Sequence, residues 1–184
     1  MLSSRGPWGY GRPMKALRTA LIGLAVFAAM IAAFLSFPVT KTVTRSRTMN
    51  APVAAVFAEA SDLTRWVVWA KPSKPHAPGS DRADAQTWSW EVTEDPGTRA
   101  TLRLTGQKPN EQVTLAMEYG ERKNVTDALG FAAKGEQTEV VWTRSITLIG
   151  IQKLAPLIHT PESVVGPLLE EQLKNLDAAV SAPK

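Results

Sequence analysis

The sequence contains no cysteine and only two histidines, His76 and His159. The absence of cysteine excludes disulfide bonds, thiolate metal sites, a lipidated cysteine and a cysteine nucleophile. With only two histidines, a histidine metal site or a Ser-His-Asp triad is not expected. The chain also lacks a phosphate-binding glycine loop and a nucleophile elbow. We therefore predict no metal site, no cofactor and no catalytic residue from the sequence.

Acidic residues are missing from the start of the chain, and the first of them is Glu59. Four basic residues, Arg5, Arg12, Lys15 and Arg18, lie ahead of a long apolar run. The chain has 21 basic and 17 acidic residues, so 17 basic residues remain to balance the 17 acidic ones. A neutral domain lacks the basic surface that binding to a phosphate backbone requires. We expect no nucleic-acid partner.

The apolar run covers residues 20–37 and contains no charged side chain. As a helix it would be about 27 Å long, close to the thickness of the hydrocarbon core of a bilayer. A cleaved signal peptide is one alternative, but the run is long for one and no small-x-small site closes it. A buried core helix is another, but this run is apolar on every face. We predict a basic segment at 1–18, a transmembrane anchor at 19–38 and a folded domain at 41–180.

The distribution of basic residues around the anchor gives a weak orientation signal. Four of them precede the run, and three follow it, namely Lys41, Arg45 and Arg47. Basic residues are enriched on the cytoplasmic side of membrane spans. We expect a single-pass membrane protein with a cytoplasmic N-terminus and the domain on the extracytoplasmic side.

The first part of the domain has the pattern of one strand followed by two helices. Residues 41–49 alternate and are rich in Val and Thr, which predicts a strand. Pro52 then opens a helix that we expect to end near Ala60, and residues 62–69 predict a second, short helix. A proline-punctuated loop follows, from about residue 70 to 79, and we interpret it as mobile or lid-like.

The second part has the pattern of a sheet covered by a helix. Five runs between residues 86 and 148 alternate with a period of two, with recognisable turns between them. One parity is apolar and the other is mostly Thr, Ser, Glu and Arg, which predicts an antiparallel meander with one solvated face. An apolar stripe at 161–180 predicts the helix that covers the other face, with Thr160 as N-cap and a kink at Gly166-Pro167.

This order of elements resembles the polyketide cyclase/dehydrase and lipid-transport branch of the SRPBCC superfamily, which is START-like and has the helix-grip fold. Short motifs carry the resemblance along residues 41 to 180: Met49-Asn50-Ala51-Pro52 with Val56-Phe57, Asp62-Leu63 with Trp66 and Trp69, Ser89-Trp90, Thr138 to Trp142, and Gly166-Pro167 with Leu173, Asn175 and Leu176. Two features depart from the family pattern. The glycine-rich strand before the first tryptophan is reduced to Ser80–Ala85, and Arg47 occupies an expected apolar position.

The resemblance implies an α+β helix-grip fold, in which a curved antiparallel meander sheet wraps around the long C-terminal helix. It also implies an apolar cavity between sheet and helix that takes lipids, polyketides or other hydrophobic small molecules. Fold alone does not fix function. The apolar parity of the strands and the apolar stripe of the helix place the candidate ligand-binding residues around this cavity. They are Trp88, Trp90, Leu102, Leu115, Tyr119, Asp127, Leu129, Trp142, Arg144, Leu169 and Leu173. Core packing without ligand contact is the alternative for the tryptophans.

Asp127 and Arg144 are the two charged residues on the apolar parity of their strands. A regular hairpin closed by residues 134–137 places Phe131 opposite Val140 and Asp127 opposite Arg144. One interpretation is an ion pair that satisfies itself on the inner face, since an unpaired buried charge is costly. The other is a polar anchor that orients the carboxylate, carbonyl or hydroxyl of a ligand.

These observations favour a membrane-tethered binding module for a hydrophobic small molecule or lipid. The alternative is a cyclase- or dehydratase-like enzyme that uses Asp127, Arg144 or Tyr119 as acid, base or oxyanion partner. We favour the binding module over the enzyme. The oligomeric state does not follow from the sequence.

Overall fold

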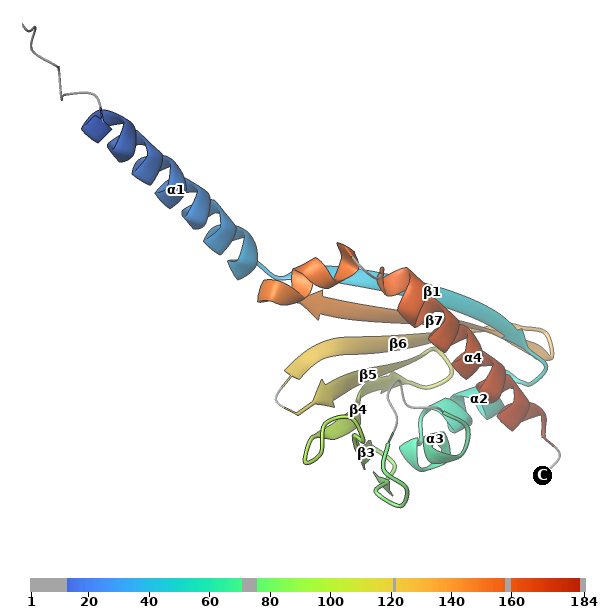
Figure 1. Ribbon diagram of the computed structural model, residues 1–184. Coiled ribbons are helices and arrows are strands. Elements are labelled where there is room, and N and C mark those ends of the chain that lie inside the picture. Colours follow the sequence, from blue (N-terminus) through green and yellow to red (C-terminus); the bar gives the residue numbers. More distant parts are fainter. Residues whose placement is uncertain (1–12, 71–75, 121, 158–159, 183–184) are drawn as a thin grey trace, which may run out of the picture.

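The computed structural model describes residues 13–70, 76–120, 122–157 and 160–182. It shows one antiparallel sheet with helices packed on one face, and a long N-terminal helix that leaves this body as a separate rod (Figure 1). The elements are α1 (Pro13–Ser36), β1 (Val39–Met49), α2 (Val53–Ala60), α3 (Leu63–Trp69), β2 (Arg82–Ala83), β3 (Thr87–Glu91), β4 (Arg99–Lys108), β5 (Gln112–Tyr119), β6 (Arg122–Lys134), β7 (Gln137–Leu148), the 3₁₀ helix η1 (Gly150–Leu157) and α4 (Pro161–Ser181). The α+β helix-grip fold is confirmed.

In the described part of the chain seven strands follow the order β1-β7-β6-β5-β4-β3-β2, so the first of them pairs with the last. All pairings are antiparallel. The segment in which the family's glycine-rich strand is reduced forms only β2, a two-residue strand at one edge of the sheet. Register between β6 and β7 is as predicted, with Phe131 opposite Val140 and Asp127 opposite Arg144. Gly135 turns this hairpin with a φ of 65°, a conformation that glycine adopts without strain.

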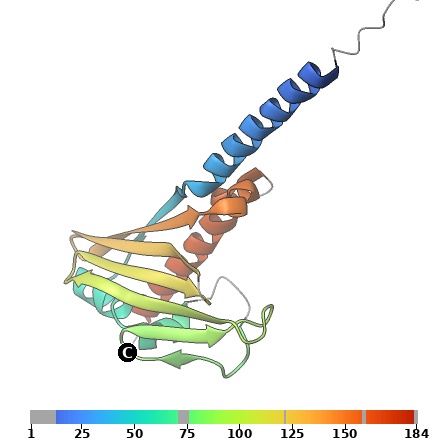
Figure 2. The same ribbon diagram turned by 90° about the vertical axis from the view of Figure 1, so that its left-hand side faces the viewer.

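Helix α4 crosses the inner face of the sheet and supplies one side of the core (Figures 1 and 2). The Thr160 hydroxyl accepts a hydrogen bond from the Ser163 amide, and Pro161 takes the first helical position, so the helix begins as predicted. Its buried stripe includes Leu169, Leu173 and Leu176. These side chains pack in one cluster with the inward residues of the sheet and of the helices α2 and α3.

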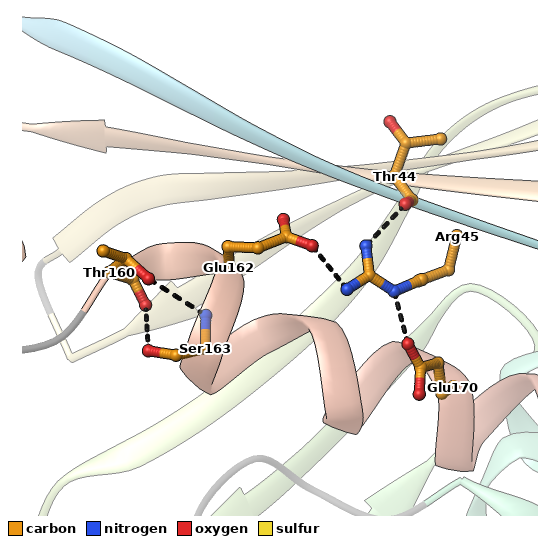
Figure 3. Close-up of polar contacts among 6 residues, drawn as sticks. All are labelled: Thr44, Arg45, Thr160, Glu162, Ser163 and Glu170. Atoms are coloured by element: carbon orange, nitrogen blue, oxygen red, sulfur yellow. Dashed lines mark hydrogen bonds and ion pairs between the residues drawn. The ribbon is translucent and has the colours of Figure 1, made fainter.

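A charged clamp holds α4 against the edge strand β1 (Figure 3). The Arg45 guanidinium lies over Gly166 and forms ion pairs with Glu162, one helical turn before this glycine, and Glu170, one turn after it. A Cβ atom at position 166 would overlap this guanidinium, so glycine permits the close approach and a larger residue would displace the arginine side chain. The two carboxylates, Glu162 first, raise the pKa of Arg45 above its ordinary value.

Arg47, the second departure from the family pattern, lies two residues further along β1 and pairs with Asp177 of α4. The Nε–Oδ2 distance is 2.8 Å, and the arginine side chain is 42% exposed. Arginine is tolerated at this inward position because it lies at the edge of the sheet, where the guanidinium reaches water and a partner at once.

Helix α1 is long and apolar enough to cross a membrane, with a span at Leu17–Ser36, a mean hydropathy of 2.3 and no burial against the domain. Length and composition of this kind suit a membrane span and a signal sequence alike. The end of α1 contacts η1, where Lys153 donates a hydrogen bond to the Phe34 carbonyl and lies 4.9 Å from the centroid of its ring. Most of the predicted basic segment, His159 and part of the predicted lid-like loop lie outside the described residues.

Candidate functional site

A pocket of about 280 Å³ lies between the sheet and the beginning of α4. It is lined by six apolar residues and one charged residue: Met117, Val125, Arg144, Ile146, Val164, Val165 and Leu168. Its position follows from the register, since Met117 pairs with Val125 and Val125 pairs with Ile146 across β5, β6 and β7. These three residues form an apolar row close to the ends of their strands. The first two turns of α4 close the opposite side.

The next row of the sheet, one step toward the centre, contains two charged residues beside a leucine. Leu115 pairs with Asp127, which pairs with Arg144. The Arg144 Nε atom donates to Asp127 Oδ1 at 2.8 Å, and Arg144 Nη2 donates to Oδ2 at 3.0 Å. Asp127 is 2% exposed and Arg144 is 5% exposed, so the predicted cross-strand pair on the inner face is confirmed.

A third donor completes the partners of the carboxylate. The indole Nε1 of Trp142 donates to Asp127 Oδ1 at 2.8 Å, from the following row of β7. Asp127 therefore accepts three hydrogen bonds, and its negative charge is balanced by the arginine that lines the pocket. Among the described residues, Arg144 Nη1 makes no hydrogen bond. A guanidinium carries five N–H groups, so this side chain retains donors for a further acceptor.

Most of the predicted ligand-binding residues lie in the packed core rather than around this pocket. Eight of them are buried to 3% exposure or less in one hydrophobic cluster: Trp88, Trp90, Leu102, Leu115, Leu129, Trp142, Leu169 and Leu173. Tyr119 is half-buried at the end of β5 and packs against the same cluster. Asp127 lies beneath the pocket, and Arg144 lines it. Ligand contact by the core residues stays a prediction.

The described pocket is thus shifted by about two rows toward the end of the sheet where β1 begins. The residues that line it, other than Arg144, were not selected from the sequence as ligand contacts. Their inward parity was visible at Met117, Val125 and Ile146, and the apolar stripe of α4 includes Val165 and Leu168. No sequence signal shows which inward residues touch one another and which leave a space.

The described residues contain no group of three or more His, Asp or Glu side chains arranged to hold a metal ion. The site is electrostatically simple, with one arginine whose charge is compensated and otherwise apolar walls. Such a site can enclose an apolar body and hold one polar group by a hydrogen bond.

The sequence model of the polyketide cyclase / dehydrase and lipid transport family matches residues 40–181. The chain belongs to this family. The match begins with β1 and ends with α4, so it covers the sheet, the helices around the core and the pocket. It leaves out α1, which is an addition to the family domain in this chain.

Several solved structures share the fold of this chain, among them one described as a START superfamily protein. The Zhui aromatase/cyclase from a Streptomyces species is 13% identical, with a TM-score of 0.56 over 77% of this chain and 94% of that chain. A truncated norcoclaurine synthase from Thalictrum flavum is 12% identical, with a TM-score of 0.55 over 80% and 97%. A START superfamily protein from Mycobacterium smegmatis is 14% identical, with a TM-score of 0.53 over 76% and 96%.

At these identities the likeness shows the fold alone. No curated protein sequence matches the chain. Membership of the family indicates a hydrophobic ligand-binding or cyclase-like module, and the finer function must be argued from the site.

Proposed function

We propose that this protein is a membrane-tethered binding module for a small hydrophobic molecule that carries one hydrogen-bond acceptor. The observation that carries the proposal is the pocket itself, in which apolar walls surround a single arginine already paired with a buried carboxylate. The apolar part of the ligand would lie against the row of Met117, Val125 and Ile146. Its acceptor would meet the guanidinium of Arg144.

The paired state of Arg144 favours a neutral acceptor over an anion. Asp127 already supplies one negative charge through two hydrogen bonds, so a carboxylate at the same guanidinium would add a second negative charge in a buried position. A carbonyl or hydroxyl oxygen accepts a hydrogen bond without that cost. We therefore infer an ester, ketone or alcohol rather than a free acid.

The volume of the pocket restricts the ligand further. Drug-sized ligands occupy sites of roughly 300–1,000 Å³, and this pocket of about 280 Å³ lies just below that range. It suits one ring system or part of one acyl chain. A whole lipid with two chains would leave most of its apolar surface outside.

The cyclase- or dehydratase-like alternative has less support from the geometry. A general acid or base must exchange a proton with a bound substrate at hydrogen-bond distance. Asp127 does not line the pocket, and both of its oxygens accept hydrogen bonds from Trp142 and Arg144. Arginine remains protonated in proteins and does not act as a base.

The tether is argued from α1. Its apolar span is not buried by the domain and ends two residues before β1, which fits a single-pass anchor that holds the domain at a membrane surface. The weak excess of basic residues ahead of the span supports an extracytoplasmic position for the domain.

Native mass spectrometry of the full-length protein, purified from its own membrane in mild detergent, tests the proposal. We expect a bound molecule of one dominant mass that organic extraction releases and that carries a carbonyl or hydroxyl group on an apolar body. Val125→Phe adds a ring to the pocket wall and should abolish this retained mass. Val141→Phe is the matched control, since Val141 is 37% exposed on the opposite face of β7. Identical bound material in all three proteins would refute binding in this pocket.

A further inference from the structure

Large apolar side chains are exposed where α1 meets the domain. Phe37 follows α1 directly and is 69% exposed. Ile149, Ile151 and Leu154 lie between β7 and the middle of η1, with exposures of 54%, 77% and 44%. We call these four residues the η1 surface. Exposed apolar residues that cluster in this way mark sites of protein or membrane contact.

The η1 surface is connected to the end of α1 by Lys153. Its ammonium group binds the Phe34 carbonyl in the last turn of α1 and lies over the ring of the same residue. The last carbonyls of a helix have no partner within it and attract cations. Because α1 has no basic residue in its last turn, Lys153 supplies this charge from another element. Lysine is also a residue that places its ammonium at the membrane–water boundary while its stem stays among apolar groups.

The pocket lies at the same end of the molecule. Ile146, in the apolar row of the pocket, pairs with Lys41 near the start of β1, only a few residues after α1 ends. Val164 lines the pocket from the first turn of α4, which follows η1 in the chain, and is itself 60% exposed. Figures 1 and 2 both show η1 beside the end of α1 and the C-terminal part of α4 at the far end of the domain.

We propose that the η1 surface inserts into the bilayer that α1 spans, so that the end of the domain bearing the pocket is held against the lipid. This inference rests on the proposed tether. Its occupant is the lipid surface rather than another protein, because the exposed side chains continue the apolar surface of α1 and the lysine among them is placed as at a membrane boundary. Short apolar segments of this kind lie in the interface with their side chains at the headgroup and acyl boundary. A hydrophobic ligand would then pass between bilayer and pocket without crossing bulk water.

The absence of cysteine allows a direct test with the full-length chain. Ile151→Cys and Leu154→Cys each introduce one thiol at an exposed position, where a nitroxide label does not disturb the core. Val68→Cys is the matched control, since Val68 is an aliphatic residue of α3 that is 88% exposed and lies away from α1 (Figure 1). The labelled proteins are reconstituted into vesicles of phosphatidylcholine and phosphatidylglycerol. Accessibility to oxygen, which concentrates in lipid, and to a water-soluble nickel chelate is then measured by electron paramagnetic resonance.

We expect the oxygen-to-nickel accessibility ratio at positions 151 and 154 to be several-fold higher than at position 68. Equal, water-like ratios at all three positions, in protein that floats with the vesicles, would overturn the η1 surface while leaving the tether intact. Protein that does not float with the vesicles would overturn the tether and with it this inference. A contact between η1 and another protein or a second copy would also give water-like ratios in vesicles at low protein density, and so counts against the proposal.

Discussion

Arg144 and Asp127 lie directly opposite each other on β7 and β6, and the guanidinium donates one hydrogen bond to each carboxylate oxygen. The pair lies between two apolar regions, the pocket row on one side and the packed core on the other. A buried pair of this kind is expensive to desolvate and is stable only while both partners are present. Replacing one partner or both partners therefore distinguishes a structural role of the pair from a ligand-binding role of Arg144.

Arg144→Ala should destabilise the domain by about 3 kcal/mol, because it leaves a buried carboxylate without its counter-ion. Replacing both residues, as Asp127→Leu with Arg144→Met, should restore much of that loss. Urea unfolding followed by tryptophan fluorescence measures both effects. If Arg144 also anchors a ligand, the double variant should fold but retain no bound molecule in native mass spectrometry. A double variant as unstable as Arg144→Ala would contradict the pairing argument.

Gly166→Ala should change the stability of the domain by different amounts in two backgrounds. In an Arg45→Ala protein it should stabilise α4 by up to about 1 kcal/mol, since alanine is the better helix former. In the wild-type protein the gain should be smaller, because the new Cβ displaces the guanidinium from its place between Glu162 and Glu170. Thermal unfolding of the four proteins gives the difference, and raising the salt concentration should reduce it. Equal gains in both backgrounds would show that the clamp does not depend on the glycine.

Asp62 caps α3 and should make its stability depend on pH. The Thr64 hydroxyl and amide donate to Asp62 Oδ1 at 2.6 and 3.0 Å, and these bonds, with the nearby Arg65, lower the pKa of Asp62 below its ordinary value of 3.8. The stabilisation is therefore complete above pH 3.8 and is lost as the pH falls through the lower pKa of the folded state.

The test of this cap compares two substitutions. Asp62→Ala should cost about 1 kcal/mol at pH 7, whereas Asp62→Asn should keep most of the cap, since asparagine is an equally good N-cap residue. The asparagine variant should also lose the part of the acid sensitivity that comes from this carboxylate. Unfolding measured at pH 7 and at pH 3 decides both points, and an asparagine variant with unchanged acid sensitivity would speak against the assignment.

The anchor should survive in the mature protein. We expect the full-length chain in the membrane pellet after carbonate extraction, with its N-terminus ahead of the apolar span. The physical reason is the length of the uncharged run, which suits a bilayer better than the shorter hydrophobic region of a signal peptide. N-terminal sequencing and fractionation check this, and a soluble mature chain that begins after Ala33 would show cleavage instead.

The sheet and its register could be predicted from the sequence because alternation leaves little freedom. A shift of one residue between β6 and β7 would turn the apolar set of one of these strands, with Leu129 or Trp142, to solvent, so the short connection and the shared parity favoured the observed pairing. The same argument placed Asp127 opposite Arg144. The N-cap of α4 followed equally from local chemistry at Thr160.

The position of the pocket could not be predicted in the same way. Parity shows which side chains point inward, but the space left among them depends on how close α4 lies to the sheet. That distance is set by the packing of Leu169 and Leu173 and by the contact between Arg45 and Gly166, which no periodicity reveals. Helix η1 was not predicted from the sequence. The spacing of Ile149, Ile151 and Leu154 does not distinguish a short helix from a loop.

The connection between α1 and β1 consists of only Phe37 and Pro38. Two residues reach at most roughly 7 Å, and the ring of Pro38 removes one of their rotations. A domain joined in this way to a membrane span has no room to swing away from its own leaflet or to reach a second membrane. With α1 in a bilayer as we propose, the domain would move only by lateral diffusion in two dimensions, and any partner that delivers or collects the proposed ligand would have to come to that membrane.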